Sequence, residues 1–421
     1  MIPPMRRAGL IVAAALALVV VAGLGFALYV IRSGHDVVGS STVEFAPTAV
    51  PLPAAARVRA SPIVWPTYGY DDERLRAAPM KLRPPYRVSW AAGIGSLLEF
   101  PPAIAFGRLF VANGDGVVIA LSTRTGRRAW TYRTGRCVAA SPAVGRYRGG
   151  TVYETFLNRR PCNAANVSDG QVVALAAGSG RVRWRRTIGP SESSPLVVGG
   201  RVYVGDWRGN VYALDARTGA TEWTFHTGGK VKGAVTMGGG RLYVGSYDGH
   251  VYALDASTGR LVWRASGDPR LFGTGTFYAT PAVAYDRVFI GSTDGKVYSF
   301  GAHTGLRRWS HSTGGYVYGS PAVAAERVYV GSYDHYFYAF DAATGVELWR
   351  FHANGPISGA ATVLDGLVYF ATLTGRTYAL DARSGAEVWT FPAGKYAPIV
   401  ADPDEVFLLG AGKIFALRPT R

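Results

Sequence analysis

Six side chains could together form a binding site. They occupy one position in six of the eight copies of a repeated pattern, two residues before a segment of the Ser-Pro-Ala-Val type, and the other two copies have Ala139 and Ser358 there. The six residues are Glu99, Glu192, Lys232, Tyr278, Tyr318 and Tyr396. Two acids, one base and three aromatic rings, at a position that the repeat leaves variable, could bind a ligand or a peptide. The alternative is a set of solvated loop residues whose tyrosines cover neighbouring units.

The chain has two cysteines, Cys137 and Cys162, which is too few for a multi-thiolate zinc site or an iron–sulfur site. They bracket the excess of the longest repeat, so in an oxidising compartment we expect a disulfide that staples this insertion. No histidine lies near either cysteine in the sequence, and we expect no metal site. The glycines mark hairpins rather than a phosphate-binding loop, and we identify no catalytic residue.

Composition indicates a folded, strand-rich and basic protein. Of 421 residues, 48% are hydrophobic and 17% charged, which excludes wholesale disorder. Abundant glycine and tyrosine suit short strands joined by tight turns. The formal charge is +17, and the stretch 86–190 holds 15 arginines against 4 acids. An anionic polymer or lipid surface could bind this sector, and the alternative is a solvated face in an arginine-rich composition.

A repeat of about 40 residues organises the chain. The segments 201–223 and 241–263 are nearly the same, and both end in tryptophan. Eight tryptophans recur at this position, and we interpret them as packing residues. They are Trp90, Trp130, Trp184, Trp223, Trp263, Trp309, Trp349 and Trp389. Such a period indicates a repeat architecture, which must be sought before local structure is assigned.

Each repeat predicts four short strands. They are the Ser-Pro-Ala-Val segment, a Val-Tyr-Val run, a Val-Tyr-Ala-Leu-Asp run and the segment that carries the tryptophan. A four-stranded sheet cannot bury both faces alone, so the copies must pack around an axis. The last copy, 398–417, has three strands, whereas Trp90 has no strands before it. We therefore predict an all-β, eight-bladed propeller, closed by pairing the strand at 86–90 with the C-terminal half-blade.

The pattern Ala-x-Asp-x-x-Thr-Gly-x-x-x-Trp at 253–263, 339–349 and 379–389 resembles the tryptophan-docking repeat of pyrroloquinoline-quinone-type (PQQ-type) propellers. That family includes quinoprotein alcohol dehydrogenases and the outer-membrane assembly lipoprotein BamB. The resemblance covers about 65–417, and the segment 65–74 resembles the one that precedes the first blade in the family. The resemblance indicates the fold more specifically than the activity.

The enzymes of this family imply a quinone cofactor, Ca²⁺, a catalytic aspartate and a disulfide between adjacent cysteines. Adjacent cysteines are absent here, and the six-residue ring offers only Lys232 to a quinone with several carboxylates. We therefore expect no cofactor and a non-enzymatic scaffold or binding module. The alternatives are a PQQ- and Ca²⁺-dependent dehydrogenase, a BamB-like assembly factor, and a sensor of polyanions or cell wall.

The N-terminus predicts a membrane anchor. Arg6 and Arg7 precede an uncharged run from Ala8 to Ile31, long enough to span a bilayer as a helix. The run ends in bulky residues, which favours an uncleaved anchor, and the positive-inside rule places the remainder outside the cytoplasm. We divide the chain into a cytoplasmic region 1–7, a signal anchor 8–31, a tether 32–63 and a propeller 64–421. We expect a monomer in the cytoplasmic membrane, an envelope protein or polymer as partner, and no nucleic acid.

Overall fold

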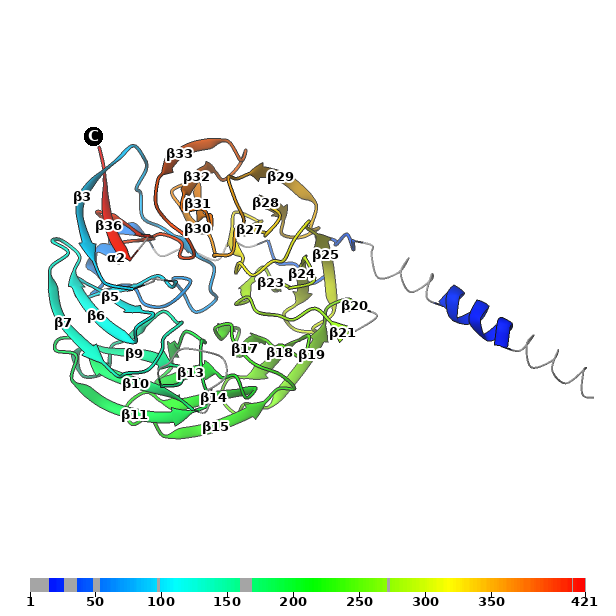
Figure 1. The fold of residues 1–421 in the computed structure, drawn as a ribbon, viewed down its shortest axis with the longest axis horizontal. Coiled ribbons are helices and arrows are strands. Elements are labelled where there is room, and N and C mark those ends of the chain that lie inside the picture. The colour runs from blue at the N-terminus through cyan, green and yellow to red at the C-terminus, as the bar shows by residue number, and fades with distance from the viewer. Residues whose placement is uncertain are drawn as a thin grey trace, which may run out of the picture.

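Eight β-sheets surround a central channel in the computed structural model of the protein (Figure 1). The structure describes residues 15–25, 36–47, 54–96, 99–159, 169–270, 273–410 and 412–420. Each sheet has four antiparallel strands, and two of the sheets gain a fifth strand at one edge. The predicted all-β, eight-bladed propeller is therefore confirmed.

The first four blades follow one another along the chain, and each runs from an innermost to an outermost strand. Blade 1 has β4 (Ala103–Ala105), β5 (Arg108–Asn113), β6 (Val117–Ser122) and β7 (Arg128–Arg133). Blade 2 has β8 (Ala143–Gly145), β9 (Thr151–Phe156), β10 (Gly170–Ala176) and β11 (Val182–Ile188). Blade 3 has β12 (Leu196–Val198), β13 (Arg201–Gly205), β14 (Asn210–Asp215) and β15 (Thr221–His226). Blade 4 has β16 (Thr236–Gly238), β17 (Arg241–Gly245), β18 (His250–Asp255) and β19 (Leu261–Ser266).

The remaining blades continue this order. Blade 5 has β22 (Ala282–Ala284), β23 (Arg287–Gly291), β24 (Lys296–Gly301) and β25 (Arg307–Ser312). Blade 6 has β26 (Ala322–Ala324), β27 (Arg327–Gly331), β28 (Tyr336–Asp341) and β29 (Glu347–His352). Blade 7 has β30 (Thr362–Leu364), β31 (Leu367–Ala371), β32 (Thr377–Asp381) and β33 (Glu387–Phe391). Blade 8 has β34 (Val400–Ala401), β35 (Val406–Gly410), β36 (Lys413–Pro419) and β3 (Tyr86–Gly93).

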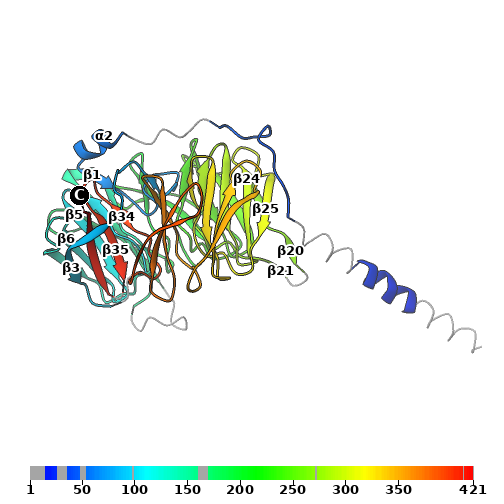
Figure 2. The same cartoon turned by 90° about the horizontal axis from the view of Figure 1, so that it is seen from above.

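A few short elements lie outside this pattern. β1 (Ile63–Trp65) joins the inner edge of blade 1, and β2 (Ala77–Ala78) joins that of blade 7. β20 (Pro269–Arg270) and β21 (Gly273–Thr274) pair in the excess between blades 4 and 5. The short helix α2 (Ala55–Ala60) lies at one face of the ring (Figure 2), and η1 (Tyr147–Gly149) is a single 3₁₀ turn in blade 2.

The repeat tryptophans join one blade to the next. Trp309 in β25 is opposite Ser299 of its own blade, and its indole N–H donates to the Ala342 carbonyl of blade 6 at 2.9 Å. The ring lies against Gly345, where a Cβ would come within 2.5 Å of Trp309. Gly345 also has a positive φ, so glycine is required there twice over. The Thr-Gly turn of blade 6 thus receives the tryptophan of blade 5.

Seven of the eight tryptophans dock in this way. The pairs are Trp90–Gly126, Trp130–Gly180, Trp184–Gly219, Trp223–Gly259, Trp263–Gly305, Trp309–Gly345 and Trp349–Gly385. The exception is Trp389 in blade 7. Its neighbour is blade 8, where β36 and β3 come from opposite ends of the chain and no turn connects them. The missing glycine therefore follows from where the ring closes.

Ring closure uses the two ends of the propeller. β3 pairs antiparallel with β36, from Tyr86 opposite Pro419 to Gly93 opposite Lys413. This pairing completes the C-terminal half-blade with an N-terminal strand, as predicted. It also removes the free edge that an open ring would expose.

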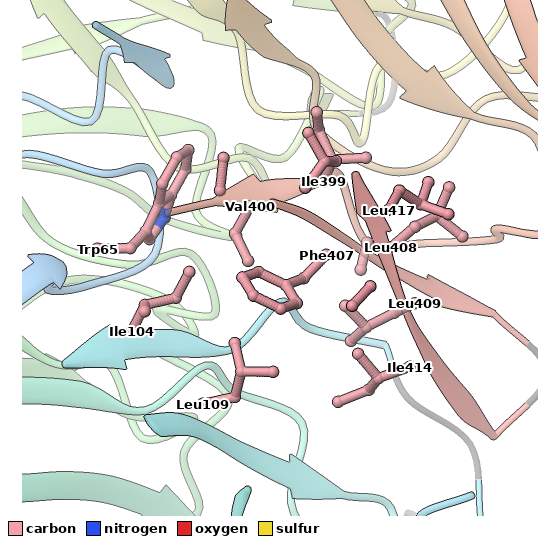
Figure 3. Close-up of a cluster of buried hydrophobic side chains, with 14 of the residues drawn as sticks. Trp65, Ile104, Leu109, Ile399, Val400, Phe407, Leu408, Leu409, Ile414 and Leu417 are labelled. Atoms are coloured by element: carbon pink, nitrogen blue, oxygen red, sulfur yellow. The ribbon is translucent and has the colours of Figure 1, made fainter. Parts of the chain in front are cut away.

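Apolar side chains fill the junction between blades 8 and 1 (Figure 3). Phe407 of β35 lies between Val400 of β34 and the blade 1 residues Ile104 and Leu109, and all four are at most 1% exposed. Trp65 of β1 packs on the same cluster. Each such side chain contributes about 1.5–3 kcal/mol on burial, so this closing junction is held by packing as well as by strand pairing.

The segment ahead of β3 runs inside the channel and contacts one innermost strand after another. Backbone N–H groups of blades 2, 4, 5, 6 and 7 donate to successive carbonyls of this segment. The pairs are Val144 to Pro66, Met237 to Asp72, Val283 to Glu73, Val323 to Leu75 and Val363 to Arg76. We call residues 62–78 the channel segment. It satisfies inner-strand donors that would otherwise face the channel unpaired.

Residues 36–47, within the predicted tether, lie along blades 5 and 6. Val37 forms a β-bridge with Ser310, and the backbone N–H of Gly39 donates to the Thr344 carbonyl. The Glu44 carboxylate accepts hydrogen bonds from Thr304 and Arg308, and these bonds lower its pKa although burial opposes the shift. The sequence did not indicate these contacts.

Within the described residues, no helix is both long enough and apolar enough to cross a membrane. Residues 15–25 of the predicted anchor are helical, and the rest of 8–31 lies outside the described residues.

Candidate functional site

A cavity of about 500 Å³ opens at the end of the channel where the innermost strands begin. All six residues that the repeat predicted for this position line it: Glu99, Glu192, Lys232, Tyr278, Tyr318 and Tyr396. Tyr68 of the channel segment lines it too, so the channel segment contributes to its wall. The volume is within the range of small-molecule sites, which lie at about 300–1,000 Å³.

Glu192 and Lys232 form an ion pair on one wall. Lys232 Nζ lies 3.2 Å from Glu192 Oε2, and both side chains are largely buried. The ammonium also lies 4.4 Å from the centre of the Trp207 ring. The ring centres of Tyr247 and Tyr278 are 5.5 and 5.7 Å away from it. Lys232 is therefore held in an aromatic cage that a carboxylate completes.

Tyrosine rings continue the cavity lining from Tyr278 onward. Tyr278 and Tyr318 meet edge to face, with ring centres 5.3 Å apart. Tyr318 meets Tyr333 in the same way at 5.2 Å, and Tyr316 lies 5.8 Å from Tyr318. Burial raises the pKa of the Tyr278 hydroxyl well above its ordinary value. These tyrosines can offer ring faces, ring edges and hydroxyl groups to a ligand.

Glu99 is not part of the ion pair between Glu192 and Lys232. No hydrogen bond or ion pair joins its carboxylate to any residue of the described ranges. Burial raises the pKa of Glu99, the Glu192 carboxylate adds to the shift, and Lys395 opposes it. The cavity thus contains one neutralised carboxylate and one that has no partner.

Sequence reasoning missed several aromatic residues of the site. Trp207, Tyr247 and Tyr333 occupy another single position of the repeat, two residues after the end of the second strand. That position holds Thr293 in blade 5 and Leu373 in blade 7, so it varies as the first ring position does. Reading this second variable position would have found them. Tyr68 carried no such signal, because it lies outside the repeat.

The other recurrent acids have structural partners. Asp248 of the hairpin turn accepts a hydrogen bond from Tyr252, and Asp294 and Asp334 accept equivalent bonds from tyrosines of their own blades. Asp255, before the Thr-Gly turn, accepts from the Thr258 hydroxyl and backbone, and these bonds lower its pKa to about 2. These carboxylates brace turns and are not available as general acids or bases.

A model of the family described as outer membrane protein assembly factor BamB matches residues 86–193, 168–316 and 294–421. The chain belongs to this family. It is 34% identical over 183 residues to a quinohemoprotein alcohol dehydrogenase of Comamonas testosteroni, covering 41% of this chain and 20% of that protein. It is 29% identical over 137 residues to BamB of Yersinia pestis, covering 30% of this chain and 31% of that protein.

The chain thus spans less than a third of the length of these curated relatives. The crystal structure of BamB from Moraxella catarrhalis has a TM-score of 0.65 at 20% identity, covering 79% of this chain and 99% of that one. This similarity shows a shared fold. The resemblance to PQQ-type propellers, predicted from the tryptophan-docking repeat, is confirmed.

The similarity to a quinohemoprotein alcohol dehydrogenase raises the question of a quinone and Ca²⁺. The cavity of this member does not fit them. Its lining offers a quinone carboxylate only Lys232, which is already paired with Glu192. The described residues contain no group of three or more His, Cys, Asp or Glu side chains that could hold a metal ion. We therefore derive no reaction through a quinone at this cavity.

Two arginines of the channel segment, Arg74 and Arg76, are almost completely buried. Arg74 is 0% exposed and donates to the carbonyls of Val235 and Pro195 and to the Thr67 hydroxyl. Burial lowers the pKa of Arg74 to about 9, and neighbouring Arg76 adds to the shift. Arg76 lies 4.7 Å from the Tyr68 ring centre. Both arginines thus connect the cavity wall to the inner strands.

Five of the 15 arginines of the sector predicted over blades 1 and 2 lie on the outer strands of these blades. Arg128, Arg133, Arg185 and Arg186 of β7 and β11 are exposed, and no ion pair joins them to an acid of the described chain. Of the sector's acids, Asp169 pairs with Arg136 at 2.7 Å. Its binding of anions remains a prediction.

Cys137 is disulfide-bonded, and its predicted partner Cys162 lies outside the described residues. That Cys162 is the partner of Cys137, and that this disulfide staples the blade 2 insertion, therefore remains a prediction.

A buried carboxyl of β9 makes stability depend on pH. Glu154 is 0% exposed, and burial raises its pKa well above the ordinary value. The unfolded chain releases this proton near pH 4.3, whereas the folded chain retains it. The contribution of Glu154 to stability is therefore fully present below that pH and falls as the pH rises, by about 1.4 kcal/mol per pH unit, until the folded pKa is reached.

Glu154→Gln is expected to remove this dependence. In urea unfolding, the variant should gain more than about 1 kcal/mol over the unmodified protein between pH 5 and pH 8. The exposed Glu387→Gln serves as the control and should track the unmodified protein at both pH values. An equal difference at pH 5 and pH 8 would show that Glu154 is ionised in the folded state.

Proposed function

We propose that this protein is a membrane-anchored, extracytoplasmic propeller that recognises an envelope partner through the cavity and catalyses no reaction. The observation that carries the proposal is the cavity itself. Six variable positions of the repeat converge there with four further tyrosines, Tyr68, Tyr247, Tyr316 and Tyr333. Repeat positions that only pack are invariant in type, as the tryptophans are, whereas a recognition surface varies from blade to blade.

The anchor in this proposal is the uncharged run from Ala8 to Ile31 behind Arg6 and Arg7. The contacts of residues 36–47 with blades 5 and 6 start five residues after that run. A chain of five residues reaches at most about 18 Å. The outer edge of blades 5 and 6 would therefore be held close to the cytoplasmic membrane, on its extracytoplasmic side.

An assembly factor at the outer membrane is the second candidate, because the BamB family model matches the chain from residue 86 to its end. A quinoprotein dehydrogenase is favoured by the similarity to the Comamonas testosteroni enzyme but not by the cavity chemistry. Titration of the full chain with PQQ and Ca²⁺ separates it from the other two. Saturable binding with one site per chain, followed by alcohol oxidation, would contradict the non-enzymatic proposal.

Site-directed photocrosslinking tests recognition at the cavity. A photoreactive phenylalanine replaces Tyr396 at the cavity or, as the matched control, Arg128 on the outer strand of blade 1. The full chain is kept in its native membranes. We expect a discrete adduct from position 396 that is lost when Tyr318 is also changed to alanine. Adducts from position 128 alone, or no adduct from position 396, would contradict recognition through the cavity.

A further inference from the structure

The cavity already binds one cation, the protein's own Lys232. Its ammonium is surrounded by the rings of Trp207, Tyr247 and Tyr278, and the Glu192 carboxylate neutralises it. Ring faces attract cations, and the attraction is stronger where the contact is shielded from water. This part of the cavity therefore shows that aromatic rings and one carboxylate together bind an ammonium group here.

Elsewhere in the same cavity lining, a second carboxylate, that of Glu99, accompanies tyrosine rings. Glu99 is partly buried beside the aromatic wall, and its charge acts on both Tyr278 and Tyr396. Its carboxylate has no hydrogen-bonding or ion-pair partner among the described residues. Removing a carboxylate from water without a partner is costly, so a ligand that supplies a cation would recover that cost.

A second lysine, Lys395, also places its ammonium group over a tyrosine ring near the cavity. Lys395 Nζ lies 5.3 Å from the centre of the Tyr396 ring, and its charge lowers the pKa of Glu99. No ion pair joins Lys395 to Glu99 in the structure. The lysine is near enough to oppose an incoming cation but does not occupy its place.

We propose that the cavity binds a basic side chain of a peptide, with its ammonium or guanidinium group between the Glu99 carboxylate and the tyrosine rings. This proposal rests on the proposed recognition function and names its ligand class. Among the charged residues that line the cavity, Glu192 and Lys232 neutralise each other and Glu99 alone has no partner, so the lining favours a cation over an anion although Lys395 at the rim opposes it. The Glu99 carboxylate also favours a basic side chain over a neutral sugar, because a sugar would leave that carboxylate unpaired.

Calorimetric titration of the full chain in detergent tests the proposal. The probes are a blocked Ala-Lys-Ala peptide, the same peptide with an acetylated lysine, and chitobiose as a neutral sugar. We expect the lysine peptide to bind at least 10-fold more tightly than the acetylated one. Glu99→Gln should weaken the lysine peptide at least 10-fold, whereas Lys395→Ala should strengthen it several-fold. The exposed Glu387→Gln should change nothing.

Affinity should also fall at acidic pH. Glu192, Lys395, Tyr278 and Tyr396 are the titratable groups near Glu99, and burial with Glu192 raises the pKa of Glu99. The carboxylate therefore gains its proton at a higher pH than an ordinary glutamate, and the lysine peptide should be released as it does. In Glu99→Gln this pH dependence should disappear.

Each outcome separates this proposal from the broader one. Equal binding of the two peptides, an unaffected Glu99→Gln variant, or weaker binding in Lys395→Ala would overturn the cation site. Binding of chitobiose alone would do so too, but recognition at the cavity would stand. If no probe binds, the cation site fails, and the crosslinking at position 396 then decides whether the recognition function fails with it.

Discussion

Replacing Arg74 by methionine is expected to lower the free energy of unfolding by about 3 kcal/mol. Methionine fills similar space but donates no hydrogen bonds, so the carbonyls of Val235 and Tyr68 lose their donor inside the ring. A buried acceptor without a partner costs about 1–3 kcal/mol. Loss of the desolvated charge offsets part of this cost but not the loss of several bonds at once.

The effect should appear first in the channel segment. The amides of Met237 and Val283 donate to its Asp72 and Glu73 carbonyls, so they should exchange with solvent about 100-fold faster in the variant. Arg59→Met is the matched control, because Arg59 is exposed and pairs only with exposed Asp404. Surface ion pairs contribute at most about 1 kcal/mol. Unchanged exchange in Arg74→Met would show that the segment is held by its backbone alone.

Replacing Trp309 by alanine is expected to destabilise the ring by about 3–5 kcal/mol. Trp309 is 0% exposed, contacts Gly345 of blade 6 and donates its indole N–H to Ala342. The rigid turn cannot move into the space that the indole leaves, so a cavity remains between blades 5 and 6. Urea unfolding followed by far-ultraviolet circular dichroism measures the loss.

Trp389→Ala provides the internal comparison. Trp389 has the same place in its repeat but is only partly buried, and no Thr-Gly turn of blade 8 receives it. Its removal should cost no more than about 2 kcal/mol, because water can enter the space. Equal losses for the two variants would show that the indole stabilises its own blade rather than the junction with the next.

The architecture followed from repetition. The period of about 40 residues and the three-stranded final copy predicted eight blades and their closure, and β3 pairs with β36 accordingly. This prediction works because every repeat has the same pattern of strands and turns. A strand that is hard to assign in one repeat can therefore be assigned from the equivalent residues of the others. The channel segment occurs once, and its contacts with five inner strands had no such support.

The candidate site was half predictable for the same reason. Alignment of the repeats placed Glu99, Glu192 and Lys232 at the mouth of the channel, since equivalent positions of a closed ring face one axis. It could not say that Lys232 is paired with Glu192 while Glu99 has no partner. Which charges meet depends on rotamers and distances across the channel, between residues that are 40 to 133 positions apart in the chain.

Local patterns thus account for the blades, the tryptophan docking and the direction of the variable side chains, because each depends on neighbours within one or two repeats. The remaining features arise from contacts across the ring. They include the path of residues 62–78 through the channel, the burial of Arg74 and the docking of residues 36–47 on blades 5 and 6. Such contacts form only after the ring has brought distant segments together, and no short-range pattern of residue types encodes them.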